Sequence, residues 1–141
     1  MRVRGDGRHV VIEGVRLVRT ALVVADLDRS VAFYAALGFE ERGRAQVGTA
    51  ARLAVLGLPE EPSRLQLTQP LEVSRPHVGG AYLVLEVADL DAARESLALA
   101  GIEPHLVPPD DTEHGTRTAV FRDPDGYGVE LMQRSARPAS A

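Results

Sequence analysis

The side chains that most often carry out chemistry are sparse in this sequence. Its 141 residues contain no cysteine and, because all 16 basic residues are arginine, no lysine. Thiolate nucleophiles, cysteine-bound metals and lysine Schiff bases are therefore excluded. No two histidines have the spacing of paired metal ligands on one helical turn; they are His9, His77, His105 and His114. The chemistry must therefore rest on other groups, with carboxylates, arginines and tyrosines prominent among them.

The composition indicates a folded cytoplasmic protein. Hydrophobic residues make up 45% of the chain and charged residues 26%, which is enough to form a core. The net charge of -4 argues against a nucleic-acid partner, which requires a clustered basic face. No stretch approaches the ~20 apolar residues of a membrane-spanning helix. No apolar segment follows the charged N-terminus, so we expect neither a secretion signal nor a membrane partner.

An internal repeat organises the chain. Residues 24–28 (VADLD) recur at 87–91, an offset of 63 residues, and residues 37–40 (LGFE) match 100–103 (AGIE) at the same offset. Residues 52–56 resemble 117–121 with a slightly larger offset, which small loop insertions explain. Such a repeat predicts two copies of one supersecondary unit.

Each copy has the pattern of a β-α-β-β-β unit. A strand rich in aliphatic residues comes first, near 17–24 and 82–87. Asp26 and Asp89 then stand where a helix N-cap belongs, with carboxylates that can accept backbone N–H bonds. A glycine ends each helix at the left-handed C′ position and two or three strands follow; the glycines are Gly38 and Gly101, and the clearest turn is 123–126 (DPDG).

The repeat defines the expected domain organisation, which is of the α+β class. We expect a single domain over 15–133, with one module at about 15–70 and the other at about 78–133. Residues 1–14 form an N-terminal extension that can fold as a short hairpin, and residues 134–141 are expected to be a disordered tail.

Two segments resemble a known superfamily. Residues 21–34 (ALVVADLDRSVAFY) with 37–39 (LGF) resemble the opening strand and helix of vicinal oxygen chelate proteins, the relatives of glyoxalase, bleomycin-resistance proteins and extradiol dioxygenases. Residues 115–117 (GTR) and 121–131 (FRDPDGYGVEL) resemble their closing hairpin. The resemblance implies two modules that form a cup-shaped mixed sheet with helices outside, and frequent homodimers.

The resemblance also assigns four cavity positions that carry His and Glu metal ligands in metal-using members. They fall on Arg19, Gln66, Tyr82 and Glu130. Only Glu130 is a good ligand, because arginine is always protonated and Gln and Tyr suit a divalent transition metal poorly. A divalent metal at Glu130 and displaced residues stays an alternative, but we expect no cofactor.

Strand alternation predicts which side chains share the cavity face. With Arg19 and Tyr82 directed into the cup, small, apolar and hydrogen-bonding groups join them, which is the usual make-up of a ligand site. The resemblance adds His114 and Arg117 in and after the loop that borders the cavity. The expected ligand-binding residues are Arg19, Val23, Gln66, Thr68, Tyr82, Glu86, His114, Arg117, Glu130 and Met132.

Two functions fit this face. The first is metal-independent binding of a small organic molecule, of the bleomycin-resistance type, with Tyr82 stacking on the ligand and Arg19 contacting either Glu130 or a ligand carboxylate or phosphate. The second is a lyase, isomerase or dioxygenase-like enzyme with Glu130 or Glu86 as general base. A module that only mediates protein association would not need a polar-lined cup.

Overall fold

The structure is a computed structural model that describes residues 3–5, 10–14, 16–72 and 80–135. It has two helices, neither of which is long and apolar enough to span a bilayer within these residues. The elements are β1 (Val3–Gly5), β2 (Val10–Ile12), β3 (Arg19–Val23), α1 (Leu27–Ala36), β4 (Glu40–Val47), β5 (Ala51–Gly57), β6 (Arg64–Pro70), β7 (Tyr82–Glu86), α2 (Leu90–Leu99), β8 (Thr116–Arg122) and β9 (Gly128–Arg134).

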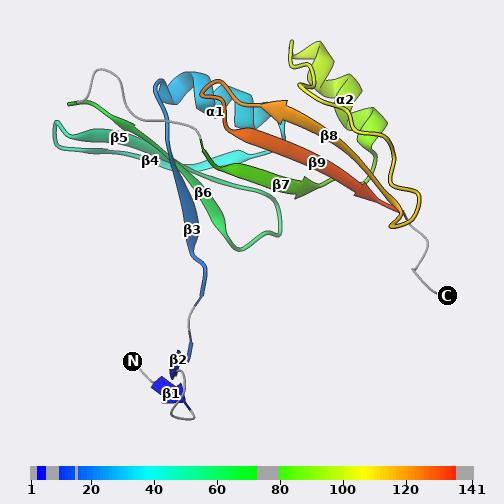
Figure 1. The fold of residues 1–141 in the computed structure, drawn as a ribbon. Coiled ribbons are helices and arrows are strands. Elements are labelled where there is room, and N and C mark those ends of the chain that lie inside the picture. Colours follow the sequence, from blue (N-terminus) through cyan, green and yellow to red (C-terminus); the bar gives the residue numbers. More distant parts are fainter. Residues whose placement is uncertain (1–2, 6–9, 15, 73–79, 136–141) are drawn as a thin grey trace.

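Two mixed sheets form the body of the molecule, one from each repeat. The first has the strand order β3-β6-β5-β4 and the second β7-β9-β8. In both, the first and last strands of the repeat are parallel neighbours, and the remaining pairs are antiparallel. Helices α1 and α2 lie on the same side of the sheets (Figure 1). The expected α+β class and its repeated unit are therefore confirmed.

The second repeat is reduced relative to the first. The strand expected directly after α2 is represented, in the described part of the chain, by an isolated bridge between Leu106 and Val120.

The expected N-terminal hairpin is present as β1 and β2 and stands apart from the two sheets (Figure 1). Strand β9 extends to Arg134, so the last ordered element reaches one residue into the segment that we expected to be disordered. His9, His77 and residues 136–141 lie outside the described residues.

The helix ends follow the sequence prediction. Asp26 accepts a hydrogen bond from the N–H of Arg29 at 3.1 Å, and Asp89 accepts one from Ala92 at 3.0 Å. The N–H group of the first residue of each helix is bound by a glutamine side chain of the sheet in the same repeat, which the sequence did not reveal. Leu27 donates to Gln69 at 2.9 Å, and Leu90 donates to Gln133 at 2.7 Å. Both C′ glycines have positive φ, +104° at Gly38 and +79° at Gly101.

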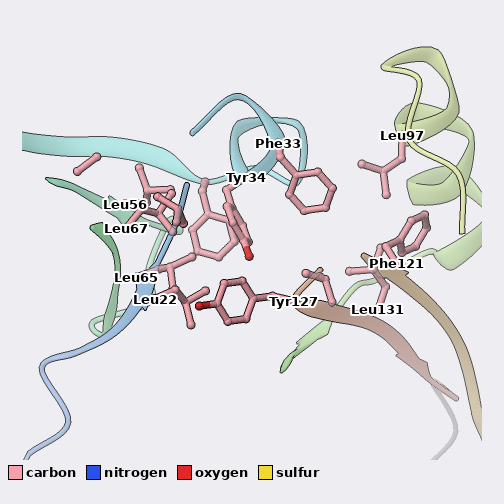
Figure 2. Packing of buried hydrophobic residues seen from close by; sticks show 14 of the residues in the cluster. Leu22, Phe33, Tyr34, Leu56, Leu65, Leu67, Leu97, Phe121, Tyr127 and Leu131 are labelled. Carbon is pink, nitrogen blue, oxygen red and sulfur yellow. The ribbon is translucent and has the colours of Figure 1, made fainter. Parts of the chain in front are cut away.

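One continuous core joins the two repeats on the helix side. Tyr34 and Phe121 are fully buried, and Phe33 packs edge-on against Tyr34 with ring centroids 5.2 Å apart. Figure 2 shows Tyr34 and Tyr127 between the leucines of the first sheet and Phe121 and Leu131 of the second. Strand alternation also predicts which residues of the first strands face the helices, and all of them belong to this core or pack against it; they are Leu22, Val24, Leu83, Leu85 and Val87.

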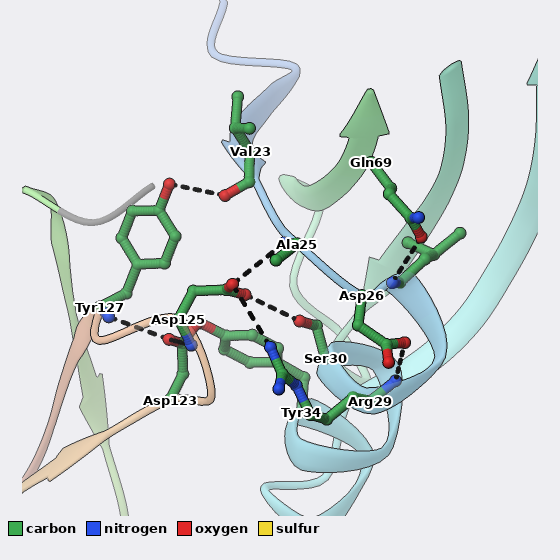
Figure 3. Close-up of polar contacts among 11 residues, drawn as sticks. Val23, Ala25, Asp26, Arg29, Ser30, Tyr34, Gln69, Asp123, Asp125 and Tyr127 are labelled. Atoms are coloured by element: carbon green, nitrogen blue, oxygen red, sulfur yellow. Dashed lines mark hydrogen bonds and ion pairs between the residues drawn. The ribbon is translucent and has the colours of Figure 1, made fainter. Parts of the chain in front are cut away.

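A buried carboxylate in the β8–β9 turn ties the second repeat to the first. Asp123, 4% exposed, accepts a hydrogen bond from the Tyr34 hydroxyl at 2.7 Å and two more from the N–H groups of Asp125 and Tyr127 (Figure 3). Burial raises the pKa of Asp123, while these three hydrogen bonds act in the opposite direction. Burial and the adjacent Asp123 also raise the pKa of Tyr34.

The same turn makes further contacts with the first repeat. Asp125, whose side chain is 1% exposed, accepts hydrogen bonds from the N–H of Ala25 (3.0 Å) and the hydroxyl of Ser30 (3.1 Å). Tyr127 donates its hydroxyl hydrogen to the carbonyl of Val23 at 2.8 Å (Figure 3). The turn therefore fixes how the end of β3 meets the start of β9, two strands that carry candidate site residues.

Candidate functional site

Each sheet has one face that no helix covers, which we call the open face. Along β6, β7 and β9 the burial alternates, with the helix-side residues more buried than their neighbours, and in β3 the helix-side Leu22 is the buried residue. This alternation agrees with the predicted cavity face. The open face carries Arg19, Ala21, Val23, Arg64, Gln66, Thr68, Tyr82, Val84, Glu86, Gly128, Glu130 and Met132.

On the first sheet, the candidate residues are adjacent on two parallel strands. Gln66 is the register partner of Ala21, one alternate position along from Arg19. The Gln66 amide donates a hydrogen bond to the Thr68 hydroxyl at 3.0 Å, and this bond fixes the orientation of the amide. Its carbonyl oxygen is therefore the end of Gln66 that can accept a hydrogen bond from a ligand.

On the second sheet, an aromatic ring and a carboxylate lie on neighbouring strands. Tyr82 is the register partner of Gly128, and Glu130 is the partner of Val84. A Cβ on Gly128 would lie 2.8 Å from the Cβ of Tyr82, so only glycine leaves room for Tyr82 in this position. The ring is 67% exposed and free to stack on a planar ligand.

The ion pair between Arg19 and Glu130, one of the two contacts considered for Arg19, is not formed in the described part of the chain. The two residues belong to different sheets, and neither has a charged partner within 4.0 Å among the described residues. Both groups therefore remain available to a ligand or to a second copy of the chain.

The four family ligand positions do not fit a divalent metal. Arg19 offers only donors, and the Gln66 amide is held by Thr68. No group of three or more His, Cys, Asp or Glu side chains comes together within the described residues. Glu130 alone supplies one carboxylate, where a zinc site takes three or four protein ligands.

Three candidate residues have partners that separate them from the centre of the open face. Arg117 is on the helix side, where it binds Asp91 at 3.0 Å and Asp110 at 3.3 Å. This contact lowers the pKa of Asp91 and raises that of Arg117. His114 lies in the preceding loop and contacts Asp111 at 2.9 Å. Glu86 is on the open face but lies 3.7 Å from Arg134.

A pair of arginines outside the expected ligand-binding set, Arg42 and Arg64, lies beside Arg19, at the end of the first sheet where β3 and β6 begin. The point where a Cβ on Gly57 would lie is 2.9 Å from Nε of Arg42 and 3.1 Å from Nη1 of Arg64. Gly57 is the register partner of Glu40, and the β-bulge between Glu41 and Gly43 contains Arg42. A glycine inside a strand can indicate such a close approach, but several glycines here have no such role.

A pocket lies next to this arginine pair, between the first and second sheets. Its volume is about 360 Å³, and its walls combine apolar side chains with a few charged groups, as ligand pockets do. The lining residues are Thr20, Phe39, Leu58, Glu61, Ser63, Arg64, Leu65, Leu83, Val84, Leu85 and Glu86.

Comparison with known proteins now identifies the family. Residues 16–131 match the Glyoxalase/Bleomycin resistance protein/Dioxygenase superfamily. The chain belongs to this superfamily. The likeness that the two quoted segments suggested is thereby confirmed, and the two repeats are the paired modules of that fold.

Two curated relatives in this superfamily are named as lyases. The chain is 32% identical over 124 residues to a probable lactoylglutathione lyase of Vibrio cholerae, covering 84% of this chain and 90% of that protein. It is 31% identical to the lactoylglutathione lyase of Neisseria meningitidis, covering 86% and 93%.

Solved structures of the superfamily include both a binding protein and an enzyme. TnmS3, an antibiotic binding protein from a Streptomyces species, is 26% identical, with a TM-score of 0.68 over 89% of this chain and all of that one. A mutant of glyoxalase I from Zea mays is 25% identical, with a TM-score of 0.74 over 87% of this chain and 46% of the maize chain.

Proposed function

We propose that this protein binds a small organic molecule on its open face without a divalent metal. The observation that carries this proposal is the chemistry of the four family ligand positions. Arg19, Gln66 and Tyr82 cannot form a metal site with Glu130, but together they offer a cation, an amide, an aromatic ring and an anion. Such a mixture orients an organic ligand.

The solved structure of TnmS3 supports this proposal, because that protein has the same fold and is described as an antibiotic binding protein. We place the present protein in the same functional class, acting in the bacterial cytoplasm by sequestering its ligand. Tyr82 would stack on a conjugated part of the ligand, and the polar groups would fix its orientation.

We further propose that a second copy of the chain completes the cavity. In a single chain the open face is exposed, with Tyr82 67% accessible, and so is the segment before β3, with Leu17 73% and Val18 63% accessible. Exposed apolar residues of this kind are typical of association surfaces. The opposite charges of Arg19 and Glu130 complement each other across a two-fold interface.

The proposal is tested by metal analysis and native mass spectrometry of the protein purified without chelator. We expect a dimer mass, less than one-tenth of a metal ion per chain, and an additional small-molecule mass in a fraction of the dimers. Stoichiometric zinc, nickel, iron or manganese would exclude the metal-independent function. A monomer with bound ligand would exclude only the shared cavity.

A second candidate function is catalysis, which the lyase names of the two curated relatives favour. Glu130 is half-buried on the open face and carries no ion pair among the described residues, so it can accept a proton from a bound substrate. In this case Glu130→Gln should lower kcat by at least about 100-fold, with little change in binding. Full activity in Glu130→Gln would reject Glu130 as the base.

A further inference from the structure

Three arginines form a row across the open face of the first sheet. Arg19 on β3 is the register partner of Arg64 on β6, so the two side chains leave the sheet side by side. Arg64 and Arg42 both reach over Gly57 of β5, and their nitrogens Nη1 and Nε lie about 3 Å from one common point. Those two nitrogens are therefore at most about 6 Å apart.

Among the described residues, carboxylates pair with this row less than with the arginines on the opposite face of the same sheet. On the helix side, Arg44 contacts Glu41 at 2.9 Å and Asp28 at 2.6 Å, and Asp28 is also 3.7 Å from Arg52. These arginines hold the pKa of Asp28 below its usual value.

On the open face the arginines have weaker partners within the described residues. Arg64 donates to the neutral carbonyl of Glu61 at 2.7 Å, and Arg42 has one exposed carboxylate, Glu40, at 3.3 Å. Arg19 has no charged partner within the described ranges. Like charges directly opposite each other on a sheet are destabilising.

We propose that Arg42 and Arg64, with Arg19 beside them, bind an oxyanion group, a carboxylate or a phosphate, of the ligand. Planar guanidinium groups bind both anions through paired N–H donors. Gly57 makes the site possible, because any side chain there would separate the two guanidinium groups. The neighbouring pocket of about 360 Å³ includes Arg64 in its wall, and so can hold an apolar part of the same molecule. This inference rests on the proposed binding function and specifies one end of the ligand.

The experiment uses inorganic phosphate and citrate as probes for the two anion classes. Melting temperatures are measured in chloride, phosphate and citrate at one ionic strength, for the full chain and for Arg42→Gln and Arg64→Gln. We expect phosphate or citrate to raise Tm of the parent by about 3 °C or more relative to chloride. Each arginine variant should lose most of this rise, and the more effective anion identifies the group.

Two controls separate binding from a structural role. Arg134→Gln removes an exposed arginine from the second sheet and should keep the full response. Gly57→Ala keeps all charges but places a Cβ 2.9 Å from Nε of Arg42, so it should weaken the response by displacing the guanidinium groups. In chloride, Arg64→Gln should melt at the same temperature as the parent or higher, because it removes a like-charge contact.

An equal rise of Tm in the parent and both arginine variants would overturn the proposal, because it would reflect a general salt effect. A lower Tm of both variants in chloride, with an unchanged anion response, would show that the arginines have a structural role instead. Neither outcome affects binding of an organic molecule at Tyr82, so the two proposals fail separately.

Discussion

Replacement of Asp123 by alanine is expected to lower the free energy of unfolding by about 3–5 kcal/mol. The carboxylate accepts hydrogen bonds from the Tyr34 hydroxyl and from two backbone N–H groups of its own turn. Alanine would leave these donors without their acceptor in the region where the two modules meet. Urea unfolding followed by circular dichroism measures the loss.

Two conservative variants show whether the hydrogen bonds are responsible. Asp123→Asn retains an oxygen for the backbone donors and should cost no more than about 2 kcal/mol, while Tyr34→Phe removes a single hydroxyl and should cost about 1–2 kcal/mol. If Asp123→Ala were as stable as Asp123→Asn, the turn would not be the main link between the modules.

The ionisation of Asp123 adds a pH dependence to the same comparison. Burial raises the pKa of Asp123 in the folded state above its ordinary value of 3.8, so protonation of this carboxylate stabilises the folded state relative to the unfolded state. That contribution is fully present below pH 3.8 and is lost as the pH rises through the folded pKa. The stability of the parent relative to Asp123→Asn should therefore decrease as the pH is raised across this window. A constant difference would show that the folded pKa is not raised.

Replacement of Tyr82 by alanine is expected to weaken ligand binding by about 30-fold or more, which corresponds to ~2 kcal/mol. The ring is mostly exposed in the single chain and contributes little to its core, so the free energy of unfolding should change by less than about 1 kcal/mol. Titration of each variant with the molecule recovered from the parent measures the binding.

The residues around Tyr82 offer matched controls. Tyr82→Phe keeps the stacking surface and should bind within a few-fold of the parent, unless the hydroxyl contacts the ligand. Gly128→Ala adds a Cβ 2.8 Å from that of Tyr82 and should weaken binding by moving the ring. Unchanged affinity in Tyr82→Ala would remove the second sheet from the proposed site.

Much of the fold could be predicted because it depends on local chemistry. The N-cap residues Asp26 and Asp89 and the C′ glycines Gly38 and Gly101 each act within a few residues of their own position. The repeat can be recognised from its constant offset along the chain. The period of two along each strand also placed Arg19 and Tyr82 on the face away from the helices. Such patterns can be recognised in a sequence without knowledge of which residues are neighbours in space.

The tertiary structure decided which distant residues meet. The DPDG turn could be recognised as a turn, but its two aspartates contact α1 and the segment between β3 and α1, about 90–100 residues earlier in the chain. Likewise, Arg117 and Arg64 have the same chemistry and opposite environments: one binds Asp91 beside a helix, and the other stands beside Arg42 over a glycine. The sequence by itself determined the modules and their faces, because these follow from spacing along the chain. The partners of each charge depend on how the sheets and bulges bring strands together, and only the folded structure specifies that arrangement.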